Sequence, residues 1–321
     1  MNTLHFRGNT FKYLKLSLVN FLMIVLSLTL LYPKAMIRDL KYLFSELTLG
    51  EKRFTYSGNQ KKYFLGYLST LCLIIFAAGI LFGFGVLLNG FFKELPIATN
   101  YFVLLAYAML LVLLLPLIVY GSIAFHSNAI SWQSISVIWD GKRSDFVPLY
   151  IQGCILNILT LGIYTAWFQV NLSKYYLSHL KFGDLQFDFS GQPKALFKIY
   201  LKGFLLGVLT LGIYNIWTFK KQYNYTINNI VVSKGAQTFK LYSNVNTLEA
   251  YEMFVGNFLI CVLSLGLASP WAYLRYFRFI TNHCGIPEAF KPEMIEQNET
   301  SNEQADAPSH WLDRLKVPFI V

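Results

Sequence analysis

Apolar residues in this chain gather into long runs and seldom alternate with polar ones. Six runs approach or exceed the ~17–25 residues that an α-helix needs to cross a bilayer. They occupy residues 14–31, 64–92, 101–123, 146–163, 199–213 and 251–267. The pattern predicts six membrane-spanning helices. Residues 287–321 begin with a polar, acidic stretch, which predicts a disordered C-terminal tail.

A degenerate repeat connects four regions of the chain. We align as one anchor position the residues Lys34, Trp167, Trp217 and Trp271. Seven positions before the anchor every copy has a hydroxyl, at Ser27, Thr160, Thr210 and Ser264. Four positions after it come cations or an amide, at Arg38, Asn171, Lys221 and Arg275. Seven positions after it come Lys41, Lys174, Asn224 and Arg278, and each is followed at once by an aromatic residue.

These positions predict that each repeat consists of two helices joined by a turn. A Leu-Gly step suits the end of the first helix, at Gly162, Gly212 and Gly266. Residues that favour the N-cap would begin the second, at Thr165, Asn215 and Ser269. In the second helix the anchor and the positions four, seven and eight later share one face. Glycine-flanked alternating segments at 50–58 and 183–191 predict short β-hairpins.

The predicted fold is an all-α polytopic membrane protein with short β-hairpin excursions. It is built from four degenerate repeats, each a membrane helix followed by a basic amphipathic helix. The expected repeats are residues 1–62, 146–196, 197–246 and 247–286, with an inserted pair of transmembrane helices at 63–145 and the tail at 287–321. If only six helices cross, the repeats alternate in orientation. If the second helices also turn back, the preferred alternative, all β-hairpins lie in the cytoplasm.

Composition narrows the class of protein. Apolar residues make up 55% of the chain and charged residues 14%, whereas soluble domains have about 45–50% and about 25%. Such a chain cannot cover its apolar surface in water, which excludes a soluble enzyme and a disordered protein. The net charge of +10 fits cytoplasmic loops and anionic lipid headgroups, and no basic run stands apart from an apolar one, so nucleic acid is not an expected partner. The four cysteines form no CxxC pair.

The fourth repeat reads LSLGLASPWAYLRYFRF over residues 263–279, and the second and third share LTLGIY at 159–164 and 209–214. Together with the Gly-x-x-Phe-x-Tyr-x-Gly-type turn near 50–58, these motifs resemble the YjgN-like family of bacterial inner-membrane proteins. The resemblance covers roughly residues 4–286. It implies a multi-pass protein of the cytoplasmic membrane, and the family brings no activity with it. Lys34 departs from the family pattern, which has Trp at the anchor.

The basic face of the second helix is the main candidate site. Its residues are Arg275, Arg278, Trp271, Arg38, Lys41, Lys174 and Lys221. One interpretation is that these cations and aromatic rings anchor a helix end among headgroups. The alternative is a binding site for an anionic group, such as a lipid phosphate, since paired cations suit phosphate.

Two further sets of residues suggest contacts between helices. Gly-x-x-x-Gly pairs let helices approach closely, either within the chain or in a homo-oligomer, and they stand at Gly79, Gly83, Gly203 and Gly207. Amides within the apolar runs would bond across helices or line a solute path, and they stand at Asn20, Asn157 and Asn257.

The sequence offers no matched acid, base, nucleophile or metal cluster, so we expect no enzyme, no cofactor and no metal. The expected function is non-enzymatic binding or handling of a lipid or small amphipathic solute, with membrane lipids as partners. Two alternatives stay open. Internal repeats also occur in solute transporters and channels, and exposed glycine faces would suit a structural partner of another membrane protein.

Overall fold

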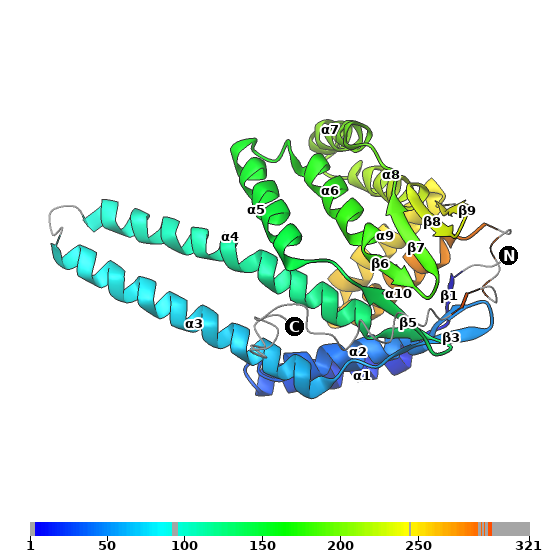
Figure 1. The fold of residues 1–321 in the computed structure, drawn as a ribbon, viewed down its shortest axis with the longest axis horizontal. Coiled ribbons are helices and arrows are strands. Elements are labelled where there is room, and N and C mark those ends of the chain that lie inside the picture. The colour runs from blue at the N-terminus through cyan, green and yellow to red at the C-terminus, as the bar shows by residue number, and fades with distance from the viewer. Residues whose placement is uncertain are drawn as a thin grey trace.

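A computed structural model describes residues 4–91, 96–243, 245–287, 290, 292 and 295–296, with the backbone alone for 96–99. Within these residues ten helices pair into five hairpins, each joined by a short connection. The hairpins are α1 (Thr10–Leu26) with α2 (Tyr32–Ser45), α3 (Gln60–Phe91) with α4 (Pro96–Asn128), α5 (Arg143–Leu159) with α6 (Thr165–Ser178), α7 (Pro193–Leu209) with α8 (Asn215–Asn228), and α9 (Thr247–Leu263) with α10 (Ser269–Asn282). The α3–α4 hairpin extends far beyond the others (Figure 1). We call the other four the short hairpins.

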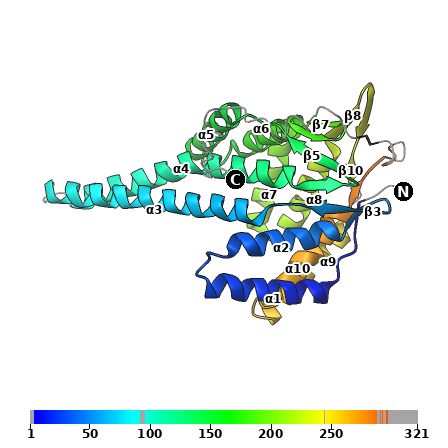
Figure 2. The same ribbon diagram turned by 60° about the horizontal axis from the view of Figure 1, so that its bottom comes forward.

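The open ends of the hairpins are connected through one antiparallel sheet, whose nine described strands pair in chain order. The strands are β1 (Leu4–Phe6), β2 (Leu47–Leu49), β3 (Lys52–Tyr56), β4 (Ile130–Trp132), β5 (Ile135–Trp139), β6 (Leu180–Phe182), β7 (Leu185–Phe189), β8 (Ile230–Lys234) and β9 (Gln237–Lys240). Phe54 lies opposite Trp132, and Phe187 opposite Val232. A separate pair joins β10 (Tyr242–Ser243) to β11 (Cys284–Gly285). Figure 2 shows the strands at one end and the tips of α1–α2 and α3–α4 toward the other.

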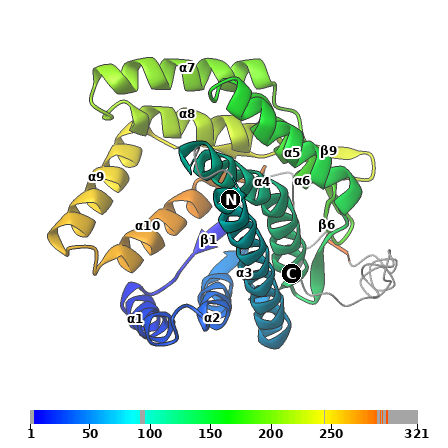
Figure 3. The same ribbon diagram turned by 90° about the vertical axis from the view of Figure 1, so that its left-hand side faces the viewer.

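The hairpins follow one another around a ring that closes where the last hairpin, α9–α10, meets the first, α1–α2 (Figure 3). Helix α10 packs against both α1 and β1. The Arg278 guanidinium donates to the Gly8 carbonyl over 2.6 Å, and the Phe6 amide donates to the Asn282 side-chain oxygen over 3.0 Å. The last hairpin therefore holds the first strand in place.

The main core lies on the sheet and takes side chains from each of its β-hairpins. It includes Phe54, Trp132, Leu185 and Val232 together with Leu274 of α10. The described part of the predicted tail completes this core, because Phe290 and Ile295 are buried in it and the backbone of Glu296 bonds to that of Asp184. Most of the predicted tail, 287–321, lies outside the described residues.

One local rule explains the repeated aromatic eight positions after the anchor. Its hydroxyl donates to the carbonyl of the residue that caps the first helix of the same hairpin, always 33 residues earlier. The pairs are Tyr42 with Asn9, Tyr175 with Lys142, and Tyr225 with Gln192, at 2.7, 2.7 and 2.8 Å. In the last hairpin Phe279 stands at this spacing from the N-cap Asn246 and has no hydroxyl. The aromatic thus ties the end of the second helix to the start of the first.

The all-α polytopic fold predicted from the sequence is wrong. The structure contains a nine-stranded sheet, and only two described helices, at Gln60–Phe91 and Asn100–Asn128, are long and apolar enough to cross a membrane. In the short hairpins the first helix has 17 residues and the second 14. Each apolar run therefore ends in a turn after about 26 Å of helix. Hydropathy counted these runs as spans because it does not register where the chain turns back.

The division into four repeats plus an inserted pair also changes. The α3–α4 pair occupies the same place in the ring as the other hairpins and has its own β-hairpin, β4–β5. Tyr63 stacks on Phe125 at its base, as Tyr13 stacks on Tyr42 in the first hairpin. The sequence did not indicate that this pair is a further unit of the same kind, because its helices have 32 and 33 residues, about twice as many as those of the short hairpins.

Candidate functional site

The tips of the short hairpins share an unusual turn. After the first helix a leucine adopts a left-handed conformation, with φ between 49° and 51°, at Leu28, Leu161, Leu211 and Leu265. Left-handed φ is uncommon for residues other than Gly, Asn and Asp because of the Cβ atom. These leucines are nevertheless 84%, 93%, 95% and 92% exposed. At each of the four tips a strained backbone thus exposes a large apolar side chain at the surface.

The repeated hydroxyl closes each of these turns. It accepts a hydrogen bond from the amide four residues later at 3.0 Å in all four hairpins, as Thr210 does from Tyr214 and Ser264 from Ala268. The sequence predicted N-caps at Thr165, Asn215 and Ser269, and this was wrong, because these are the first helical residues and the residues before them make no side-chain cap. The upstream hydroxyl satisfies the amide instead. The tips are thus ordered turns.

Each short hairpin is locked at one facing pair of positions 15 residues apart. In the first and last hairpins the pair is Asn and Ala, and the Asn20 and Asn257 amides donate to the Ala35 and Ala272 carbonyls at 3.2 and 3.1 Å. In the two middle hairpins it is Gly with a larger residue, Gly153 with Phe168 and Gly203 with Thr218. The amides that suggested a solute path therefore bond within their own hairpins. Asn157 does the same by accepting from Thr165.

The predicted basic face is not brought together into one pocket. Arg275 lies over Gly256 of α9 and donates to the Glu252 carbonyl at 3.3 Å. Arg278 closes the ring at Gly8, and Arg38 donates to the sulfur of Met23 at 3.2 Å. Lys41, Lys174 and Trp271 are exposed on separate hairpins. The position four after the anchor faces the partner helix, so Arg38 and Arg275 bond within their own hairpins.

The α7–α8 hairpin is different, because two ammonium groups meet on one ring. Lys221 of α8 lies 5.1 Å from the centroid of the Trp217 indole, and Lys202 of α7 lies 5.2 Å from it. Both lysines are exposed. Lys202 was not among the sequence candidates. Its signal was a lone cation inside an apolar run, 15 positions before the anchor Trp217.

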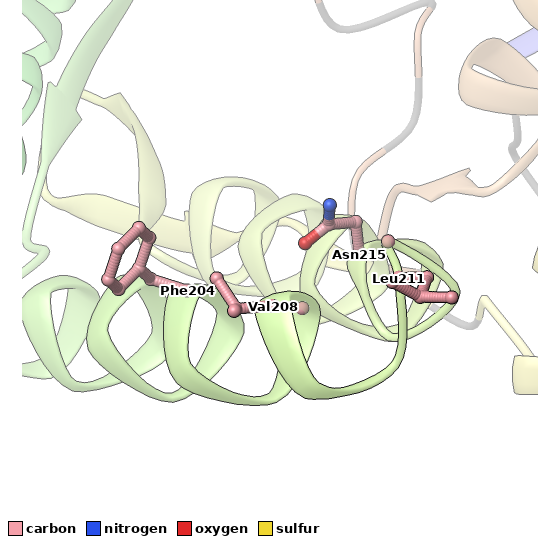
Figure 4. A pocket seen from close by; sticks show the side chains of 6 residues that line it. Phe204, Val208, Leu211 and Asn215 are labelled. Carbon is pink, nitrogen blue, oxygen red and sulfur yellow. The ribbon is translucent and has the colours of Figure 1, made fainter.

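A separate hollow of about 320 Å³ lies nearer the tip of the same hairpin. It is lined by Phe204, Gly207, Val208, Leu211, Gly212 and Asn215. Figure 4 places Phe204 and Val208 along α7, with Asn215 extending from the start of α8 and Leu211 at the turn. The hairpin thus has a cationic end near the sheet and an apolar end at the tip.

Comparison with known proteins identifies the chain at the level of its family. A family described as bacterial proteins of unknown function (DUF898) matches residues 1–214 and 220–308. The chain belongs to this family. The YjgN-like resemblance inferred from the motifs is therefore confirmed. No curated protein and no solved structure matches it.

The predicted packing glycines of this DUF898 member fall into two groups. Gly203 and Gly207 are buried against Thr218 and Asn215 of α8, so they pack the hairpin internally. Gly79 and Gly83 of α3 face open space, with nothing within 4 Å of an added Cβ. Both lie in a candidate membrane span, and the two spans favour association with a membrane.

One acidic side chain lies deeper than the sequence suggested. Asp39 of α2 accepts a hydrogen bond from the Asn20 amide at 2.9 Å, and burial raises the pKa of its carboxyl to about 6. Its helical neighbour Arg38 offsets only part of this shift. From the sequence Asp39 is a possible salt-bridge partner of Arg38; its burial was not predicted, because it follows the apolar run. Across the described residues no three His, Cys, Asp or Glu side chains are grouped to hold a metal ion.

Proposed function

We propose that this protein is a lipid-binding protein of the bacterial cytoplasmic membrane and catalyses no reaction. Helices α3 and α4 cross the bilayer, and the tips of the short hairpins enter one leaflet. The observation that carries the proposal is the set of four left-handed, exposed leucines at the tips. In water each leucine would combine backbone strain with apolar exposure. In the hydrocarbon of a bilayer the side chain leaves water, and this transfer stabilises the inserted tip by ~25 cal/mol per Å² of apolar surface.

The lengths of the exposed apolar surfaces support this depth. On α7 large exposed apolar residues run from Leu201 to Leu211 at the tip. Ten residues of helix measure about 15 Å, half of the ~30 Å hydrocarbon core. The 32 residues of α3 measure about 48 Å, enough to cross the whole core. Short hairpins that lie inclined around α3–α4 reach less than half the bilayer.

The charge on the sheet supports its placement in the cytoplasm. Its strands carry five cations, Lys52, Arg53, Lys181, Lys234 and Lys240. An excess of Lys and Arg on one side of a membrane marks the cytoplasmic side. The same cations would lie near anionic headgroups of the inner leaflet.

Nitroxide accessibility tests the proposal. In a chain whose four native cysteines are replaced by alanine, Leu161→Cys, Leu211→Cys and Leu265→Cys carry spin labels at the tips, and Glu51→Cys carries one at an exposed strand turn. In bilayers dissolved oxygen should speed the spin relaxation of the tip labels, and a water-soluble nickel complex should have little effect on it. For the Glu51 label the nickel complex should have the larger effect. Tip labels as open to nickel as the Glu51 label would refute the proposal.

The exposed glycines of α3 favour a second function, association with another membrane-spanning helix. Gly79 and Gly83 lie one turn apart and leave the backbone open to close approach. Gly83→Cys should then form a crosslink within the bilayer, to a second copy or to a partner. The control is Phe84→Cys, which is exposed on the same helix but points away from the Gly79/Gly83 face. Equal crosslinking at both positions would speak against a specific contact.

A further inference from the structure

We propose that a hollow at the base of the α3–α4 hairpin binds a phosphate ester that carries an ammonium group, the chemistry of an ethanolamine headgroup. The Lys62 ammonium binds the phosphate, and the carbonyls of Gly58 and Asn59 accept hydrogen bonds from the ammonium group of the ligand. This inference deepens the proposed function, because it names the headgroup and the hairpin that binds it. It rests on the proposed function for the source of the headgroup, since a lipid reaches this place only if α3 and α4 cross the bilayer.

The hollow has a volume of about 290 Å³ and lies where the start of α3 meets the end of α4, beside the sheet. Ligand pockets usually measure about 300–1,000 Å³, so this one suits a small headgroup. Lys62 of α3 and Asn128 of α4 bring N–H donors to it from two helices. The Asn128 side-chain oxygen accepts from the Trp139 amide at 2.8 Å, which leaves its NH2 group to donate to a phosphate.

The first hairpin has the same local sequence and shows how the chain itself can fill such a place. Gly-Asn-x-x-Lys-Tyr spans residues 8–13 in one and 58–63 in the other, and both asparagines cap the helix that follows. In the first hairpin the Lys12 ammonium lies 5.6 Å from the centroid of the Tyr42 ring. The Tyr42 hydroxyl donates to the Asn9 carbonyl at 2.7 Å, and the Arg278 guanidinium donates to the Gly8 carbonyl at 2.6 Å.

The α3–α4 hairpin lacks all three of these contacts. Phe125 takes the place of Tyr42, because it stands three residues before the end of α4 and stacks on Tyr63 with the ring centroids 4.9 Å apart. It has no hydroxyl to donate to the Asn59 carbonyl. Among the described residues no side chain donates to the Gly58 carbonyl, and the Lys62 ammonium has neither a carboxylate within 4.0 Å nor an aromatic ring against it. Two acceptors and one cation are thus left to face a common hollow.

Four hairpins have a glycine before the cap of their first helix, and the other three use side chains to satisfy the carbonyls there. In α5–α6, Tyr120 donates to the Gly141 carbonyl at 2.8 Å and Tyr175 to the Lys142 carbonyl at 2.7 Å. In α7–α8, the carbonyl at the cap accepts from a tyrosine at 2.8 Å. Within the described residues α3–α4 alone leaves both carbonyls without such a donor, although Gly58 is buried. A ligand that donates there removes the cost of an unpaired buried carbonyl.

The first hairpin also indicates which donor fits, because the group on the Gly8 carbonyl is a cation. An ammonium group at the Gly58 carbonyl would form the same charge-assisted bond. The phosphate of the same ligand then lies at Lys62, so that both charges of a zwitterionic headgroup are paired.

The direction of the hollow suits a lipid in the inner leaflet. Asn128 ends α4 beside the sheet, and Gly121 lies seven residues toward the tip, about 10 Å along the helix. The polar rim therefore lies at the level of the sheet, and the floor at Gly121 and Phe125 continues toward the hydrocarbon. A headgroup at the rim would place its glycerol and acyl chains along α4.

Native mass spectrometry of the full chain tests the site, with phosphatidylethanolamine and phosphatidylcholine offered together from mixed micelles. Choline keeps the positive charge but has no N–H group to donate to the two carbonyls. We expect one phosphatidylethanolamine to stay bound, at least about fivefold in preference to phosphatidylcholine. Lys62→Gln should weaken this binding about tenfold, because a charge-assisted contact to the phosphate is lost. The control Lys61→Gln removes the same charge from the exposed neighbouring position and should change it less than about twofold.

A second variant closes the hollow without removing a charge. Phe125→Tyr restores the tyrosine that three other hairpins have at this position, and its hydroxyl should donate to the Asn59 carbonyl. Phosphatidylethanolamine binding should fall at least about fivefold, while the melting temperature stays the same or rises. Equal retention of the two lipids, equal losses in Lys61→Gln and Lys62→Gln, or unchanged binding in Phe125→Tyr would overturn the site.

Soluble phosphoethanolamine, which is the headgroup without acyl chains, distinguishes the two sources of the ligand. We expect a large excess to be needed to displace the lipid, because the acyl chains add contacts along α4. Displacement of half the bound lipid by an equimolar amount would overturn the lipid in favour of a soluble phosphate ester. The tip nitroxides test the proposed function separately, so labels that still report hydrocarbon leave it standing if this site fails.

Discussion

Gly203 and Thr218 face each other inside the α7–α8 hairpin, and this pair gives a quantitative test of how the hairpins are locked. A Cβ at position 203 would lie 2.5 Å from the Thr218 methyl and 3.1 Å from its Cβ. Gly203→Asn therefore overpacks the hairpin, at a cost of about 1–3 kcal/mol. Thr218→Ala alone removes a methyl group beside a glycine and should cost about 1 kcal/mol.

The double variant Gly203→Asn with Thr218→Ala recreates the pair found in the first and last hairpins. There the Asn257 amide bonds to the Ala272 carbonyl at 3.1 Å, and the new Asn should bond to the carbonyl at 218. We expect a coupling free energy of about 2 kcal/mol in the cycle of four proteins. In a chain of this size 1 kcal/mol corresponds to about 2–4 °C. Gly203→Asn should therefore lower the melting temperature by about 4–8 °C, and the double variant, whose net cost is about 1 kcal/mol, by about 2–4 °C. A double variant that melts as low as the two single effects added together would refute this account.

Three other changes have expected outcomes. Between about pH 4 and 6 the folded protein holds a proton on Asp39 that the unfolded chain releases. The free energy of unfolding should therefore fall as pH rises through this window, by about 1–2 kcal/mol after screening by solvent. In Asp39→Asn the melting temperature should depend less on pH over that range, and an unchanged slope would contradict this. Tyr225→Phe removes the bond to the Gln192 carbonyl and should cost about 1 kcal/mol in thermal melts, a loss that Tyr→Phe at the exposed Tyr101 should not reproduce. Ile295→Ala should cost about 2–4 kcal/mol because Ile295 is 6% exposed in the main core, and a melting temperature equal to that of the unaltered chain would show that this segment adds nothing.

The sequence predicted the two-helix unit because its chemistry is local. The hydroxyl, the Leu-Gly step and the terminal aromatic recur at fixed offsets, and the structure gives each a contact within one hairpin. The α3–α4 pair was predicted as an insertion and not as a further repeat, because its helices are longer and its β-turn has Gln133 and Ser134 in left-handed conformations where other copies have glycine. Without the glycine, nothing in the sequence marked the turn.

The number of crossings and the candidate site depended on information that is not local. A run of apolar residues reads the same whether its helix crosses the bilayer or turns back halfway, so hydropathy could not separate α3 from α7. The basic face was predicted from the spacing along the second helix alone. Which cation is left unpaired depends on the facing residue of the first helix, Gly256 for Arg275 and Lys202 for Lys221.

The contact between Arg278 and Gly8 joins residues 270 positions apart, and it has a consequence for biosynthesis. Strand β1 leaves the ribosome first, yet its partner α10 leaves near the end. Four hairpins must therefore be made while the ring is still open, and the ring closes only when α10 has been made. Because β1 and α10 meet there as neighbouring hairpins do elsewhere, the ring has no required starting point. A circularly permuted gene that opens the chain at the Gly235 turn and links the old ends should yield the same circle.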